Sequence, residues 1–218
     1  MEHGWGCVLG CNGELSMLAG DIGTNRKDFT MSDPWFIDTI ADSYGVVMMN
    51  SWWFTPTEPV DSRIAVMAAL KQRNPKIQTV LYQPIDRAGD SDLILDQLKA
   101  RPEWWLRTDS GEVVPFGGQP GGHPMPNYSI PECQDWYASL AISLFPNCSA
   151  AANLLDGTFL DGDGYLQHPG VSTARNEAVY EGMVQTTRKM QAKLTALNGH
   201  GQVIINSGMW CTGNGTGP

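Results

Sequence analysis

The sequence predicts an α/β fold in which helices cover a parallel β-sheet. Apolar runs of strand length alternate along the chain with segments whose apolar residues recur at helical spacing. The apolar runs are continuous rather than alternating with polar residues, which is typical of strands buried on both faces. Together the two patterns indicate right-handed βαβ units within a single domain over residues 1–218.

The first half of the chain carries two strand signals, each with a helix before it. Residues 32–34 form an N-cap cluster that opens a short helix, and the apolar run 44–50 follows as a strand. Asp61 can cap the second helix, which Asn74-Pro75 stops before the strand at 77–83.

The second half repeats this alternation. A helix is expected over about 91–100, and the Ser129–Glu132 segment has the form of a capping box that opens another. A strand is predicted at 154–161. The longest helix, over about 172–198 with Gly199 as its stop, leads into the last strand at 202–206.

Two segments interrupt the pattern. Residues 1–30 are predicted to be irregular. Residues 101–128 contain five Pro and five Gly and are long for a connection, which is typical of binding loops and lids. The pair Trp104-Trp105 in this loop fits a sugar platform or, more readily, a hydrophobic anchor, because such paired Trp side chains are usually buried.

Composition excludes several functional classes. The 218 residues include 14 Lys+Arg and 23 Asp+Glu, a net charge of -9, which argues against a surface that binds nucleic-acid phosphates. A hydrophobic content of 42% excludes a disordered chain, and no apolar run approaches the roughly 20 residues of a membrane span. The 8 Trp suit a protein that binds sugars. We therefore expect no nucleic acid and no membrane. The Trp content agrees with a carbohydrate partner, and the oligomeric state stays open.

Motifs for metals, cofactors and other hydrolases are missing. The five Cys form no CxxC pair, so zinc-ribbon and thioredoxin interpretations fail, while disulfides and free thiols both stay open. The segment 161–164 begins like a calcium-binding EF-hand loop but lacks its later ligands. Ser207 has no Gly-x-Ser-x-Gly elbow, and no Walker or dinucleotide motif occurs. We expect neither a metal nor a cofactor.

Targeting signals are sparse. Sequons at Asn127, Asn147 and Asn214 permit glycosylation and lean towards an extracellular or secretory location. No signal peptide is visible at the N-terminus. Both ends look cut, so we expect the chain to be a fragment.

Polar and aromatic side chains stand where the predicted strands end. In parallel α/β folds the carboxyl ends of the strands form the ligand site. The residues expected there are Asn50, Trp52, Trp53, Tyr82, Gln83, Asp86, Asp161, Asp163 and Asn206. Glycosidic bond hydrolysis needs two carboxylates, one as acid and one as base or nucleophile. Amides can bind sugar hydroxyls, and aromatic rings can stack on sugars.

Asp161 is the leading catalytic candidate because it directly follows an apolar strand. Asp86 and Asp163 are its candidate partners. A structural role also fits these acids, since Asp in Gly-rich stretches is common in turns. Asp156 precedes the strand and is interpreted as a structural turn residue at its opposite end, whereas His168 follows the Asp161 loop within reach of the site.

Three segments resemble a family of glycoside-hydrolase-like TIM barrels. The first runs from Leu70 to Lys76, the second is the Arg101–Gly111 block RPEWWLRTDSG, and the third is Leu155–Asp161, LDGTFLD. The resemblance spans about residues 32–208. The sequence departs from the family pattern at Asn127, where relatives often carry an Asp.

The resemblance implies a TIM-type (β/α)8 barrel, incomplete or truncated in this chain because a full barrel typically takes about 250 residues. It also implies Asp161 as a catalytic residue and carbohydrate as the substrate class. The resulting hypothesis is a glycoside hydrolase that acts on a polysaccharide or oligosaccharide. The alternatives are a non-catalytic carbohydrate-binding barrel and a hydrolase or lyase of another substrate on the same scaffold.

Overall fold

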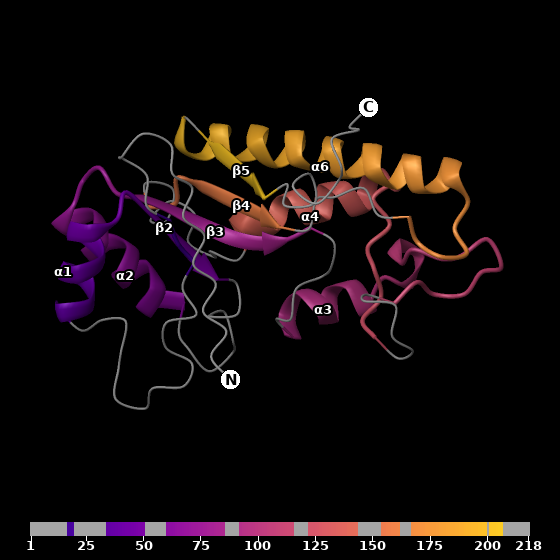
Figure 1. The fold of residues 1–218 in the computed structure, drawn as a ribbon, viewed down its shortest axis with the longest axis horizontal. Helices are drawn as coiled ribbons and strands as arrows, with labels where there is room; N and C mark the ends of the chain where they lie inside the picture. The colour runs from indigo at the N-terminus through magenta and orange to yellow at the C-terminus, as the bar shows by residue number, and fades with distance from the viewer. Residues whose placement is uncertain are drawn as a thin grey trace, which may run out of the picture.

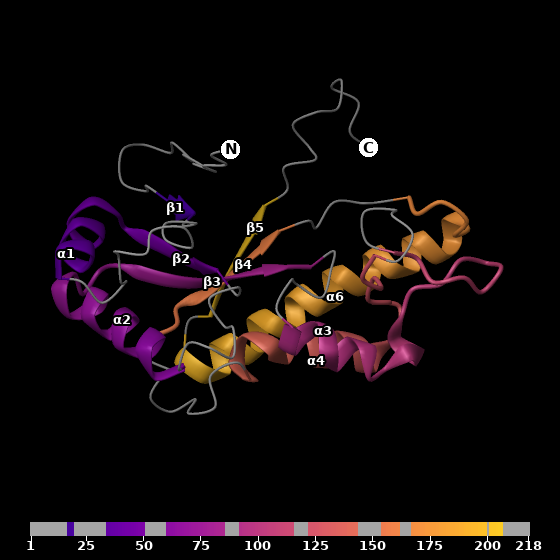
Figure 2. The same ribbon diagram turned by 90° about the horizontal axis from the view of Figure 1, so that it is seen from below.

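The computed structural model describes residues 17–19, 34–50, 60–85, 92–115, 122–143, 154–161, 167–199 and 201–206. These residues form a parallel β-sheet and the helices that pack against it (Figure 1). Seen from below, the helices lie on one side of the strands (Figure 2).

Within the described residues, the sheet has five parallel strands in the order in which they occur in the chain. They are β1 (Met17–Ala19), β2 (Val46–Asn50), β3 (Gln78–Pro84), β4 (Gly157–Asp161) and β5 (Gln202–Asn206). The predicted α/β class with a parallel sheet is confirmed. The β1 strand corrects the expectation that residues 1–30 are irregular throughout, because it pairs with β2. Its three residues are too short a run to give a strand signal in the sequence.

Helices connect the later strands. They are α1 (Pro34–Ser43), α2 (Val60–Arg73), α3 (Asp92–Lys99), α4 (Pro131–Ser143) and α6 (Thr173–Asn198), with a 3-10 turn at Pro102–Trp104. The α6 helix ends at Gly199, which has a left-handed φ of 82° and donates its N–H to Thr195 O. This confirms the predicted stop at the end of the longest helix.

Each face of the sheet contributes side chains to its own apolar cluster. The helix-covered face contributes to the main core, which includes Val47, Leu81, Ile85, Leu160 and Met190. The opposite face carries a smaller cluster of Val46, Met48, Val80 and Phe159, with Tyr82 and Ile204 packed against it. Because side chains alternate along a strand, neighbouring residues point to different faces.

Residues 101–128, which we call the arm, form a folded connection rather than an open loop. Antiparallel bridges and backbone hydrogen bonds join its two described parts. Trp105 donates its indole N–H to Leu98 O at 2.7 Å, and Trp104 packs on Trp136 with ring centroids 5.5 Å apart. Both arm Trp side chains are half-buried against the core, as expected for a hydrophobic anchor.

The arm is attached to α6 at its tip and at its base. At the tip, Asp109 accepts a hydrogen bond from Arg175 Nη1 at 2.7 Å, which lowers the pKa of this exposed carboxyl, and donates its backbone N–H to Gly170 O at 2.8 Å. At the base, a Cβ added to Gly182 would lie 1.8 Å from Tyr128 O. Only glycine allows the helix to approach the arm so closely.

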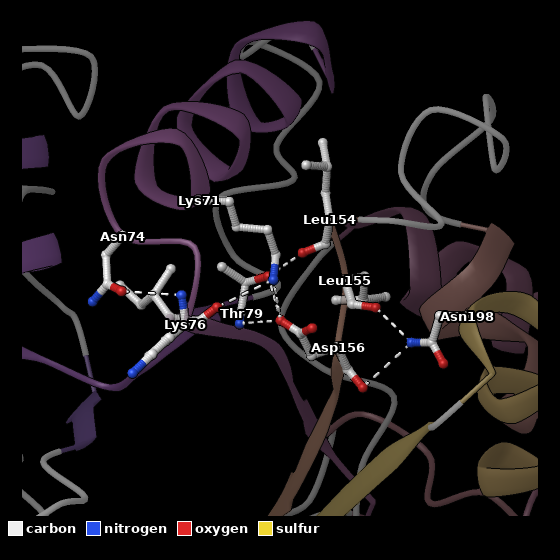
Figure 3. Close-up of polar contacts among 9 residues, drawn as sticks. Lys71, Asn74, Lys76, Thr79, Leu154, Leu155, Asp156 and Asn198 are labelled. Atoms are coloured by element: carbon white, nitrogen blue, oxygen red, sulfur yellow. Dashed lines mark hydrogen bonds and ion pairs between the residues drawn. The ribbon is translucent and has the colours of Figure 1, made fainter.

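A polar network joins the amino ends of β3 and β4 (Figure 3). Asp156, directly before β4, accepts hydrogen bonds from Lys71 Nζ at 2.6 Å and from the Thr79 backbone N–H at 2.7 Å. Lys71 also donates to Ile77 O at 3.1 Å. Asp156 therefore joins α2, β3 and β4 at the end of β4 opposite to Asp161, in keeping with the structural role expected for it.

The described strands leave β1 and β5 at the two edges of the sheet. The complete (β/α)8 barrel, its truncation and the single domain over the whole chain stay predictions. No helix within the described ranges is long and apolar enough to cross a membrane.

Candidate active site

Tyr82 and Asp161 lie side by side near the carboxyl ends of neighbouring strands. The Tyr82 hydroxyl donates a hydrogen bond to Asp161 Oδ2 at 2.6 Å, a length typical of a phenol bound to a carboxylate. Both residues are half-buried, and the Tyr82 ring stacks on Phe159 with centroids 6.0 Å apart. The register pairs Tyr82 with Phe159 and Pro84 with Asp161. Tyr82 and Asp161 therefore come from the same face of the sheet.

The backbone of Asp161 is hydrogen-bonded as well as its side chain. Asp161 is the last residue of β4, where the sequence predicts it. Its carbonyl oxygen accepts a hydrogen bond from Ile85 N–H at 2.8 Å, directly after the end of β3. The main chain and the side chain of Asp161 thus both depend on the carboxyl end of β3.

Gln83 lies on the other face of the sheet. Its side chain is 1% exposed, and its Oε1 accepts a hydrogen bond from the Thr158 hydroxyl at 3.0 Å. Its Nε2 has no hydrogen-bond partner in the structure as described. Gln83 directly follows Tyr82, so the alternation of the strand turns its side chain into the helix-covered core. We therefore leave Gln83 out of the proposed site.

The structure describes some of the other predicted site residues but not all of them. Asn50 and Asn206 end β2 and β5, with Asn50 in register with Tyr82 and Asn206 in register with Asp161. Asn50 and Tyr82 thus share one level of the register, and Asp161 and Asn206 share the level two residues further towards the carboxyl edge of the sheet. Four further candidates lie outside the described residues: Trp52, Trp53, Asp86 and Asp163. No group of three His, Cys, Asp or Glu that could hold a metal occurs in the described part of the chain.

His168 lies in a small pocket between the arm and α6. The residues around it include Met125, Tyr128, Asn176 and Met183. Burial in these surroundings lowers the pKa of the His168 imidazole below its usual value. The imidazole is therefore neutral near pH 7, and the pocket is uncharged there.

The stability of the protein is expected to fall below about pH 6.5 through His168. The unfolded chain takes up the proton before the folded chain does, because the folded state holds the pKa of His168 lower. The stability that neutral His168 contributes is fully present above the pKa of His168 in the unfolded chain. It is lost as the pH falls through the pKa of His168 in the folded protein. Urea unfolding at about pH 7.5 and about pH 5.5 measures it. The wild type should lose more stability than His168→Gln, and equal losses would contradict the prediction.

The contacts of Cys133 and Asn127 indicate structural roles for both residues. Burial raises the pKa of the Cys133 thiol to about 12, so it stays protonated and is no nucleophile. The Asn127 side-chain oxygen accepts hydrogen bonds from the backbone N–H of Ser129 at 3.2 Å and from its hydroxyl at 2.6 Å. Asn127 therefore shapes the turn before α4. The remaining cysteines lie outside the described residues.

Two tyrosines that contact the end of β3 were not predicted from the sequence. Tyr137 of α4 donates its hydroxyl to Pro84 O at 2.5 Å, and Tyr128 of the arm donates to Ile85 O at 2.7 Å. A buried Tyr needs a partner for its hydroxyl. The sequence shows that each tyrosine hydroxyl needs a partner if it is buried, but no local pattern identifies the carbonyl that accepts the hydrogen bond.

The chain resembles known proteins in structure rather than in sequence. No family model matches the sequence, and no curated protein sequence does. An α-galactosidase from Lactobacillus brevis is similar in structure, with 16% identity and a TM-score of 0.50. The type III pullulan hydrolase from Thermococcus kodakarensis is similar with 10% identity and a TM-score of 0.51.

The likeness is one of fold. It covers 82% and 78% of this chain, and 25% and 31% of the α-galactosidase and pullulan hydrolase chains. The chain therefore spans about a quarter to a third of the length of these solved structures. At such low identity the likeness supports the α/β fold and leaves the chemistry to the residues of the site.

Proposed function

We propose that the chain belongs to a carbohydrate-active enzyme that hydrolyses a glycosidic bond in a polysaccharide or oligosaccharide. The observation that carries this proposal is the Tyr82–Asp161 hydrogen bond at the carboxyl edge of a parallel sheet. Active sites of parallel α/β folds lie at this edge. The fold shared with an α-galactosidase and a pullulan hydrolase supports carbohydrate as the substrate class.

Asp161 is assigned the role of nucleophile or base. The Tyr82 hydroxyl donates to Asp161 Oδ2, and a phenol donor of this kind supports a carboxylate that attacks a sugar or activates water. The Tyr82 hydroxyl orients the carboxylate. The second carboxylate, which gives its proton to the leaving glycosidic oxygen, is assigned to Asp86 or Asp163.

The remaining strand-end residues are proposed to hold the sugar. Asn50 and Asn206 end the strands at the two sides of the Tyr82–Asp161 pair, and their amides suit sugar hydroxyls. Trp52 and Trp53 directly follow β2 in the sequence, and an indole ring offers an apolar face to a sugar ring. Hydrolysis by two carboxylates requires no cofactor.

Release of reducing ends from a panel of glycans tests the proposal. The panel should contain α- and β-linked polymers together with their oligosaccharides, and binding should be measured on the same glycans. We expect hydrolysis of at least one of them. Binding without release of reducing ends would contradict hydrolysis and favour the non-catalytic carbohydrate-binding alternative. Neither binding nor release would contradict both.

A further inference from the structure

We infer that Tyr137 is a positioning residue for Asp161, acting through the peptide group that joins Pro84 to Ile85. The inference rests on the proposed function in one respect, that Asp161 is the reacting carboxylate. Tyr137 belongs to α4, under the helix-covered face of the sheet, and is remote from Asp161 in the sequence.

One planar peptide group connects the two residues. The Tyr137 hydroxyl donates to the carbonyl oxygen of Pro84 at 2.5 Å. The N–H at the other side of the same peptide bond, that of Ile85, donates to Asp161 O at 2.8 Å. Because a peptide group is rigid, fixing its carbonyl oxygen also fixes the direction of its N–H. The two hydrogen bonds are in series, so each polarises the next.

The same strand end also controls the Asp161 side chain. Pro84 is in register with Asp161, and Tyr82, which donates to Asp161 Oδ2, lies two residues earlier on β3. A tilt of the peptide after Pro84 would change the contact to the Asp161 backbone while Tyr82 still held the carboxylate. The carboxylate of Asp161 would then turn relative to a bound sugar, and small errors of this kind lower reaction rates strongly.

Tyr137 is itself rigidly held. Its side chain is 1% exposed, and its ring meets the Tyr128 ring edge-on with centroids 5.4 Å apart and an interplanar angle of 85°. Packing of this kind restricts the hydroxyl to one position. A phenylalanine would fill the same space but would leave Pro84 O without this donor.

Tyr128 provides a matched control within the same structure. It is also 1% exposed, and its hydroxyl donates to Ile85 O at 2.7 Å. That carbonyl belongs to the next peptide group and not to the one that joins Pro84 to Ile85. Tyr128→Phe therefore removes a hydrogen bond of the same kind from the same strand end without releasing the peptide that holds Asp161.

Hydrogen exchange and kinetics on Tyr137→Phe and Tyr128→Phe test the inference. After correction for global stability, the Ile85 amide should exchange about tenfold faster in Tyr137→Phe than in Tyr128→Phe. On a glycan that the wild type hydrolyses, Tyr137→Phe should lower kcat about tenfold with KM unchanged, and Tyr128→Phe should keep kcat within about twofold of the wild type.

Equal effects of the two variants on Ile85 exchange would overturn the inference, since both bonds would then serve only the stability of the strand end. An unchanged kcat in Tyr137→Phe would overturn it as well. If the wild type hydrolyses no glycan, the proposed function is contradicted, and the exchange comparison still decides whether Tyr137 holds the Asp161 backbone.

Discussion

Replacement of Asp161 by Asn is expected to lower glycan hydrolysis by about 10³-fold or more. An amide neither attacks an anomeric carbon nor accepts a proton as a carboxylate does. The replacement has nearly the same shape, and its carbonyl oxygen can still accept the Tyr82 hydrogen bond. The free energy of unfolding should therefore change little. Measurement of kcat/KM on a responsive glycan, together with urea unfolding, checks both expectations.

Two further variants define the scale of this effect. Asp96→Asn removes an exposed carboxyl of α3 and should leave hydrolysis unchanged. Tyr82→Phe removes a hydrogen bond to a charged group and should lower kcat/KM by about tenfold to a hundredfold. Full hydrolysis by Asp161→Asn would show that this carboxylate does not react, and the site would have to be sought elsewhere.

The strand pattern is what made the position of Asp161 at a strand end predictable. The apolar runs of β2, β4 and β5 end at polar residues, and a parallel sheet brings those ends to one edge. Asn50 is in register with Tyr82, and Asn206 is in register with Asp161, two residues further along. Gln83 shows the limit of this argument. Gln83 also lies near a strand end in the sequence, but the alternation of side chains along the strand directs its side chain to the opposite face of the sheet. Strand-end position therefore has to be combined with face before a residue is assigned to a site.

Contacts between segments that are distant in the sequence could not be predicted from the sequence. Tyr137 and Pro84 are joined by one hydrogen bond across the fold, and nothing in either local sequence marks the pair. The arm is a similar case, because its Gly and Pro content predicts a loop while its backbone is held by bridges and by contacts to α6. Local patterns predict elements, whereas the support of the site depends on how those elements pack.

Asp156→Asn is expected to reduce the free energy of unfolding by about 3 kcal/mol. The Lys71 and Asp156 side chains are only 17% and 15% exposed, so removal of the carboxylate charge leaves the Lys71 ammonium largely buried without its ion-pair partner. The Asp156 carboxylate also accepts from the Thr79 backbone N–H, which ties β3 to β4. Urea unfolding followed by circular dichroism measures the loss.

An exposed ion pair is the appropriate control. Asp38 accepts from Arg73 Nε at 3.0 Å, with side chains 60% and 46% exposed, and Asp38→Asn should cost less than about 1 kcal/mol. A Lys71→Met change added to Asp156→Asn should recover part of the lost stability, because no unpaired charge then stays buried. A cost for Asp156→Asn as small as that for Asp38→Asn would contradict a structural role.

The opposite outcomes expected for Asp156 and Asp161 follow from their places on one strand. Asp156 lies directly before β4, at the amino end, where its carboxylate is bound to Lys71 and Thr79. Asp161 ends β4 at the carboxyl edge, held by Tyr82 and Ile85. The same substitution should therefore cost stability at the first position and chemistry at the second. An Asp156→Asn protein that still folds should hydrolyse glycan normally, so the pair of variants separates the support of the sheet from the reaction at its edge.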